Sequence, residues 1–129
     1  MERRTCLLAL PAAGAAALLP AQSRGKPIQL HLDLNVDPAR EKEMVANFHK
    51  IFRPTIRKQP GFVEVKLMKL RETLAGAPPA NATYRLLISF ETEEQRKQWV
   101  AADDHQRAWP AIESTLRGAK YGAVLFDLV

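Results

Sequence analysis

Cysteine is almost absent from this 129-residue sequence, and the only one, Cys6, lies near the beginning. A chain that starts after that segment has no disulfide, no thiolate metal site and no cysteine nucleophile. Common catalytic signatures are also missing: a phosphate-binding glycine loop, a Gly-x-Ser-x-Gly elbow and a His-Glu-x-x-His pair. The three histidines show no regular metal-ligand spacing. We therefore expect no bound metal.

Charge of one sign is not concentrated in any part of the chain. The formal net charge is +5 at pH 7, from 19 basic and 14 acidic residues. Such a modest balance favours solubility over nucleic-acid binding. The length and the hydrophobic fraction of 47% are typical of one globular domain with a single core.

Long apolar runs are confined to the beginning of the chain. Two arginines precede an Ala/Leu-rich run that ends at Leu19, and Ala21-Gln22-Ser23 has the small-x-small pattern of a cleavage site. A proline and a glycine interrupt the run, which is too short for a permanent membrane anchor. Residues 1–23 are therefore predicted to be an export signal. Residues 24–129 are expected to form the mature domain, periplasmic or secreted and free of the membrane after cleavage.

The type of export signal stays open. Arg3-Arg4 followed by Thr5 resembles a twin-arginine signal, a route used by proteins exported already folded or loaded with a cofactor. Glu2 stands where Ser or Thr is usual. An ordinary secretory signal that carries two arginines is therefore an equal alternative.

The first half of the domain has the pattern of a strand followed by a helix. Residues 28–36 alternate between apolar and polar side chains, which predicts a strand with one buried face. Asp37-Pro38 is typical of a helix start. The apolar residues at helical spacing after it are Met44, Val45, Phe48, Ile51 and Phe52. Pro54 is expected to bend or end this helix.

The second half adds two strands, a helix and a final strand. Gln59-Pro60-Gly61 predicts a turn into a strand over 62–70, and a loop over 73–81 leads to a strand over 84–90. Thr92 resembles the first residue of a capping box, and its helix is expected to run at least to 108. Trp109-Pro110 should interrupt it, with Ile112 and Leu116 continuing the apolar stripe to Gly118. A last strand is predicted over 121–129.

This order of elements, βαββαβ, predicts an α+β domain of the ferredoxin-like kind. Both helices would cover one face of a four-stranded antiparallel sheet. The other face would carry polar side chains, namely His31, Asp33, Asn35, Glu64, Lys66, Arg85 and Ser89. That face is either solvated or the contact of a homodimer in which two sheets enclose a barrel, which would add stability to a small cysteine-free domain.

The segment from Phe90 to Trp109 carries a resemblance to a known family. It has a strand ending in Phe, a short acidic helix start, Trp99 and, six residues later, His105. This pattern resembles the antibiotic-biosynthesis-monooxygenase family of dimeric α/β barrels. The order of elements is similar over the whole mature region, including the Pro60-Gly61-Phe62 entry to the second strand.

The resemblance implies a function without fixing the reaction, because one fold hosts many activities. Members that oxidise phenolic or quinone-type compounds use neither metal nor flavin. By that resemblance Trp99 and Trp109 would line a pocket for a small aromatic ligand, and His105 would take a proton from the substrate hydroxyl. Arg85 or Asn35 would hold the resulting anion. An exported enzyme is also remote from cytosolic nicotinamide and flavin pools, so we expect no cofactor.

Each of these residues has a simpler interpretation. Tryptophans at helical spacing are more often core residues, and His105 could be a core histidine oriented by Asp103 or Asp104. His49 is expected at the surface and His31 at a dimer contact. The corresponding alternative function is a non-catalytic dimeric module that binds a small apolar ligand.

Heme degradation is a third interpretation, based on another branch with the same fold. That branch needs a histidine about ten residues after the helix tryptophan, and Trp109 stands there. It also needs an asparagine on the first strand at a position that falls near Leu32. Asn35 and His105 would be displaced substitutes, so heme binding is not favoured.

Overall fold

The computed structural model describes residues 26–78 and 82–129. The predicted export signal over 1–23 lies outside the described residues, together with Cys6, and so does the last part of the predicted loop over 73–81. Within the described ranges, no helix has the length and apolarity needed to cross a membrane.

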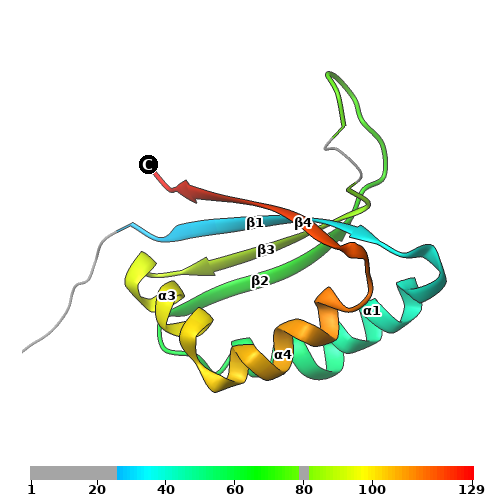
Figure 1. Cartoon of the computed structure of the whole chain (residues 1–129). Coiled ribbons are helices and arrows are strands. Elements are labelled where there is room, and N and C mark those ends of the chain that lie inside the picture. The colour runs from blue at the N-terminus through cyan, green and yellow to red at the C-terminus, as the bar shows by residue number, and fades with distance from the viewer. Residues whose placement is uncertain (1–25, 79–81) are drawn as a thin grey trace, which may run out of the picture.

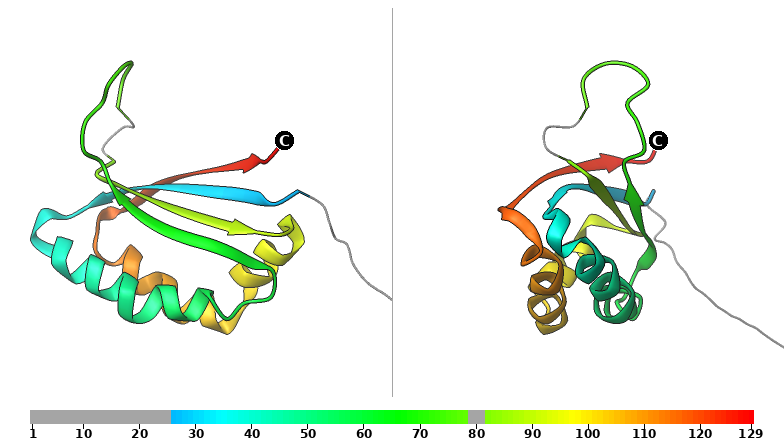
Figure 2. Two further views of the ribbon diagram at one scale, coloured as in Figure 1. Left: turned by 180° about the vertical axis from the view of Figure 1, so that it is seen from behind. Right: turned by 90° about the vertical axis from the view of Figure 1, so that its right-hand side faces the viewer.

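Four strands form one antiparallel sheet in the order β2-β3-β1-β4 (Figure 1). Their bounds are β1 Ile28–Val36, β2 Phe62–Lys69, β3 Tyr84–Phe90 and β4 Leu116–Asp127. The two crossovers, β1 to β2 and β3 to β4, are helical and lie on the same face of the sheet (Figure 2). The ferredoxin-like βαββαβ fold predicted from the sequence is therefore confirmed.

The first crossover is a nearly continuous helical segment in four parts. These are η2 Pro38–Arg40, α1 Glu41–Asn47, the π-helical turn η3 Phe48–Phe52 and α2 Arg53–Ile56. Asp37 caps the beginning, because its side chain accepts a hydrogen bond from the Ala39 N–H at 2.9 Å. The predicted helix start is confirmed.

Pro54 does not end this crossover, so of the two predicted effects, a bend or an end, the end is excluded. Proline has no N–H for the helical hydrogen-bond ladder. The wider π-helical turn η3 stands just before it and takes up the mismatch, so the chain stays helical to Ile56. The same change of pitch turns Ile51 to the solvent, and Ile56 is buried instead.

The second crossover breaks at Ala102, earlier than the predicted break at Trp109-Pro110. It consists of α3 Glu93–Ala101 and α4 Asp103–Glu113, and Ala102 between them has an extended backbone with ψ 150°. The Thr92 side chain accepts from the Gln95 N–H, as the capping pattern predicts. Pro110 is accommodated inside α4, and Leu116 is the first residue of β4 rather than part of the helical stripe.

The hydrophobic core lies between the sheet and the helices. Alternate residues of β1 and β3 point into it. The buried ones are Ile28, Leu32, Leu34 and Val36 on β1 and Leu86, Ile88 and Phe90 on β3. The helical side of the core contains Met44, Phe48, Phe52, Ile56, Trp99, Ala108 and Ile112. Burial of this apolar surface is the main stabilising contribution to the fold.

The opposite sheet face, here called the open face, is covered by none of the described helices (Figure 2). Its polar part matches the prediction, with Asp33 accepting two hydrogen bonds from Arg85 and His31 beside Gln29. Its apolar part was not predicted from the sequence. Cross-strand register places Leu87, Val124 and Phe126 on this face, and the Phe126 ring packs edge-on against His31 at 4.9 Å.

Candidate functional site

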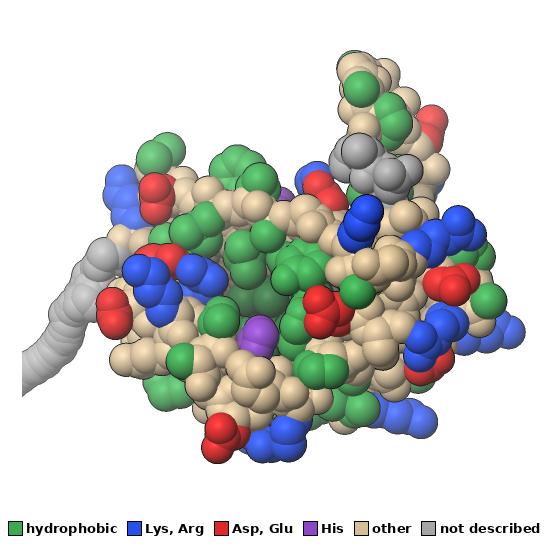
Figure 3. Space-filling view, viewed as in Figure 1, with side chains coloured by type: hydrophobic (Ala, Val, Ile, Leu, Met, Phe, Trp, Pro, Cys, Tyr) green, Lys and Arg blue, Asp and Glu red, His purple; other side chains and the backbone are tan. Residues whose placement is uncertain are grey.

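A cavity of about 280 Å³ lies between the helices and the sheet, and we call it the aromatic pocket. Its lining residues are Leu30, Leu32, Phe52, Ile88, Arg96, Trp99, Val100, His105, Trp109, Tyr121 and Ala123. Figure 3 shows a hollow with hydrophobic walls on this side of the molecule and a histidine at its edge. The sheet residues in the lining are aliphatic apart from Tyr121, so the polar groups come mainly from α3 and α4.

The helix break at Ala102 sets the geometry of this pocket. Arg96 and Trp99 are three residues apart and share one face of α3. His105 and Trp109 are four residues apart and share one face of α4. Because the chain changes direction between α3 and α4, both faces line the same cavity.

Aromatic rings surround the His105 imidazole. The Trp99 ring meets it edge-on at 5.0 Å between centroids, and the Trp109 ring stacks beside it at 6.4 Å. Trp109 also contacts Tyr121 of β4 edge-on at 5.1 Å, and Phe52 supports both tryptophans from the first crossover. These spacings are those of favourable aromatic pairs.

The His105 Nδ1 atom is buried and has no hydrogen-bond partner among the described residues. The predicted orienting role of the neighbouring aspartates is not seen, because Asp104 accepts hydrogen bonds from Gln59 and Arg107 instead. Burial lowers the pKa of the imidazole, and the negative charge of Glu113 partly opposes this shift. The neutral ring is therefore favoured, and its buried Nδ1 lacks the hydrogen bond that a buried polar atom normally makes.

Arg96 adds a positive charge at the pocket wall. Its Nε and Nη2 atoms donate hydrogen bonds to the two carboxylate oxygens of Glu93, each at 2.6 Å. This pairing lowers the pKa of Glu93 and raises that of Arg96. Both groups are thus charged at neutral pH, and the guanidinium has a fixed orientation.

The structure brings together three of the five predicted site residues. Trp99, His105 and Trp109 line the aromatic pocket, and Trp99 is also part of the core. Arg85 and Asn35 do not reach it. Strand alternation places both on the open face, where Arg85 is paired with Asp33. Their predicted role in holding a ligand anion in this pocket is not supported by their position.

The remaining histidines lie outside the aromatic pocket. His49 is exposed, and His31 lies on the open face. Three other lining residues, Arg96, Phe52 and Tyr121, were not predicted. The spacing of Arg96 from Trp99 could have identified it, whereas Phe52 and Tyr121 reach the pocket only through tertiary packing.

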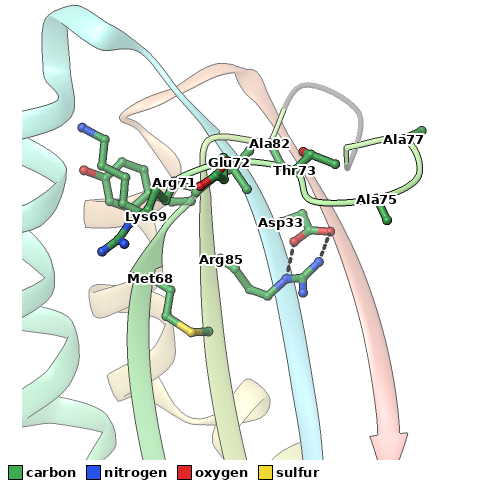
Figure 4. Close-up of a pocket in the computed structure, with 12 residues that line it drawn as sticks. Asp33, Met68, Lys69, Arg71, Glu72, Thr73, Ala75, Ala77, Ala82 and Arg85 are labelled. Carbon is green, nitrogen blue, oxygen red and sulfur yellow. Dashed lines mark hydrogen bonds and ion pairs between the residues drawn. The ribbon is translucent and has the colours of Figure 1, made fainter.

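A second cavity, of about 400 Å³, lies under the segment that follows β2 (Figure 4). The Asp33–Arg85 pair and Met68 form its base, and residues 70–73, Ala75 and Ala77 form its rim. Tyr84 also lines it, and the Tyr84 hydroxyl donates to Glu41 at 2.5 Å. Burial, with help from Glu41, raises the Tyr84 pKa to about 12. A phenol with such a pKa is a poor acid or base near neutral pH.

Metal ligands do not converge at either cavity in the described part of the chain. Among residues 26–78 and 82–129 there is no group of three or more His, Cys, Asp or Glu side chains that could hold a metal ion.

Comparison with known proteins assigns this arrangement to a family. The family model described as antibiotic biosynthesis monooxygenase matches residues 27–110, which contain β1 through most of α4 and include Trp99, His105 and Trp109. A comparison with curated protein sequences finds no match.

Solved structures share the fold at low sequence identity. One is a mutant form of SnoaB from Streptomyces nogalater, a cofactor-independent oxygenase; it is 16% identical, with a TM-score of 0.64 over 80% of this chain and 93% of that one. A candidate antibiotic biosynthesis monooxygenase from Bordetella bronchiseptica is 20% identical, with a TM-score of 0.65 over 82% and 99%. A dimeric ferredoxin-like protein of unknown function from Jannaschia is 16% identical, with a TM-score of 0.64 over 80% and 98%.

Proposed function

The chain belongs to the antibiotic biosynthesis monooxygenase family, and from this premise we propose that it is a cofactor-independent monooxygenase for a small aromatic or quinone-type compound. The observation that carries the proposal is the His105 imidazole. It is favoured in its neutral form, has an unpartnered Nδ1 among the described residues and lies between two tryptophans in a cavity of about 280 Å³. A small planar electron-rich ligand suits a cavity lined by such rings.

In the proposed reaction the substrate supplies all the electrons. His105 accepts the proton of a substrate hydroxyl, which makes the ring electron-rich enough to react with O₂. One oxygen atom is inserted into the substrate, and the other leaves as water with two substrate hydrogens. The apolar lining excludes other water from the reacting carbon. SnoaB, which shares the fold, is described as a cofactor-independent oxygenase.

Oxygen consumption with a panel of hydroquinones tests this function. His105→Gln keeps a polar side chain but cannot act as the base, and we expect kcat/KM to fall about 100-fold. His49→Gln is the matched control, because that exposed histidine is outside the aromatic pocket and should leave the rate unchanged. No uptake beyond autoxidation, or equal rates for His105→Gln and wild type, would refute the enzyme proposal.

A non-catalytic ligand-binding module is the second candidate. It is favoured by Trp99, which is only 3% exposed and packs edge-on against Phe52 as part of the core. In that case hydroquinones bind with no oxygen uptake, and His105→Gln changes affinity alone.

We also propose that the protein works as an exported homodimer. The open face carries exposed Val124 and Phe126 next to mixed charges, a combination suited to self-association across a two-fold axis. Dimeric ferredoxin-like proteins are among the structures that share the fold.

Export has its own test. Full-length protein produced in a bacterial host should be found in the periplasmic fraction, shortened by about 23 residues. Replacing Arg3-Arg4 with two lysines should retain it in the cytoplasm if the route is twin-arginine and should have little effect if the route is the ordinary secretory one. A full-length product in the cytoplasm of the wild type would contradict export.

A further inference from the structure

Arg96 is the only Asp, Glu, Lys or Arg side chain among the described residues that line the aromatic pocket. It belongs to the same helix face as Trp99, one turn earlier in α3. Most of its side chain is buried, with 19% exposed. Figure 3 shows basic and acidic side chains together at one end of the hollow and a further acidic side chain on its other side, near the histidine. Arg96 is therefore the one guanidinium that the described pocket lining offers to a ligand.

Glu93 uses only part of the hydrogen-bonding capacity of Arg96. A guanidinium has five N–H donors on three nitrogens, and the carboxylate takes one from Nε and one from Nη2. The Nη1 atom makes no hydrogen bond to the described residues. Glu93 thus orients the group while leaving donors for a second acceptor.

A neutral apolar ligand would be a poor occupant of this pocket. It would cover the Arg96 donors that Glu93 does not use and give them no acceptor, which carries the cost of unpaired buried donors. A carboxylate answers that need, because its two oxygens match the planar guanidinium. The aromatic walls and His105 meanwhile suit a ring that bears a hydroxyl group.

We propose that the pocket is selective for hydroxylated aromatic carboxylic acids, with Arg96 as the specificity-determining residue that binds the carboxylate and His105 facing the hydroxyl. This inference rests on the proposed function, because it places the ligand in the same pocket. It goes further by naming the substrate class and the residue that selects it.

The test compares two ligands that share a ring and differ at the carboxyl group, which is charged in one and methylated in the other. 6-Hydroxy-2-naphthoate and its methyl ester have the same ring and hydroxyl, and calorimetry gives the Kd of each for the mature protein. We expect wild type to bind the acid at least about 10-fold more tightly than the ester, the effect of one charge-assisted hydrogen-bond pair.

Arg96→Met should bring the two affinities to within about 2-fold by weakening binding of the acid alone. The measured quantity is a ratio within one variant, so a reduced folded fraction affects both ligands equally. Arg96→Met combined with Glu93→Gln removes the unpaired carboxylate and should give the same loss of preference. Arg107→Met is the matched control, because Arg107 pairs with Asp104 at the same i,i+3 spacing on α4 but outside the pocket.

Each outcome bears on a different statement. Equal affinities of acid and ester for wild type, or a preference that survives Arg96→Met, would overturn the inference and leave the proposed pocket in place. Binding of neither ligand, together with no hydroquinone oxidation, would overturn the proposed function and the inference with it.

Discussion

The imidazole of His105 connects the chemistry of the pocket with the stability of the fold. Burial lowers its pKa from the ordinary value of about 6.5, and Glu113 acts in the opposite direction. Unfolding restores the ordinary value, so the unfolded chain binds more protons than the folded chain as pH falls below about 6.5. The stability contributed by neutral His105 is therefore complete above that pH and is lost as pH falls through the folded pKa.

Urea unfolding at pH 7.5 and pH 5.0 measures this contribution. Wild type should lose more of its free energy of unfolding between the two values than His105→Gln, which has no group that titrates at this position. Carboxylates with lowered pKa values, such as Glu93, also lose stability in acid, but they are common to both proteins and cancel in the difference. Equal losses would mean that the histidine is not desolvated in solution.

At the scale of single elements, the turn into β2 depends on Gly61. Its φ of +79° is disfavoured for residues with a side chain, and an added Cβ would overlap the side-chain amide of Gln95. Gly76 has a similar φ of +75° but open space around it. Gly76→Ala should therefore cost about 1 kcal/mol of stability, and Gly61→Ala about 1 kcal/mol more, because Gln95 must leave its contact with Thr92.

Thermal or urea unfolding of the two variants checks this difference. Gly61→Ala combined with Gln95→Ala should need no further displacement of the amide, so Gly61→Ala should cost less in that background than in wild type. If Gly61→Ala and Gly76→Ala cost the same, the contact with Gln95 plays no part.

The strands and caps were predictable because they depend on local sequence. The alternation over 28–36 gives β1 with its buried face, and Thr92 gives the start of α3. The helix break could not be placed in this way. Pro110 is the strongest local breaker, yet the chain breaks at Ala102, and α4 then packs against the sheet through the contact of Trp109 with Tyr121 of β4.

The candidate site was predictable only in part. Periodicity and the family resemblance led to Trp99, His105 and Trp109 because all three lie in one short segment. The family resemblance assigned Arg85 and Asn35 to the ligand site, although the alternation of side chains along their strands places both on the open face. The structure agrees with the alternation. Tyr121 is brought into the pocket by the pairing of β4 with β1, which no local pattern encodes.

At the scale of the whole molecule, the open face should control self-association. Val124 is 52% exposed and Phe126 is 51% exposed, so a charge at either position would meet the partner's apolar surface. Phe126→Asp should shift a dimer seen at micromolar concentration in sedimentation velocity to a monomer. Leu74→Asp is the control, because Leu74 is 87% exposed in the segment after β2 and should leave the dimer intact.

Sedimentation of the wild type can also contradict the dimer. A wild type that sediments only as a monomer at these concentrations would leave the open face as a solvated surface. Its apolar side chains would then need another explanation.

Strand β4 belongs to both surfaces at once, because successive residues of a strand point in opposite directions. Tyr121 and Ala123 line the aromatic pocket, whereas Val124 and Phe126 lie on the open face. A subunit contact that holds β4 in place would also fix one wall of the pocket. Ligand binding in the pocket and pairing of the subunits would then be thermodynamically linked. By reciprocity, a bound ligand would raise the affinity between subunits by the same factor by which dimerisation raises the affinity for the ligand. Dilution of the protein would consequently weaken its apparent affinity for the aromatic compound.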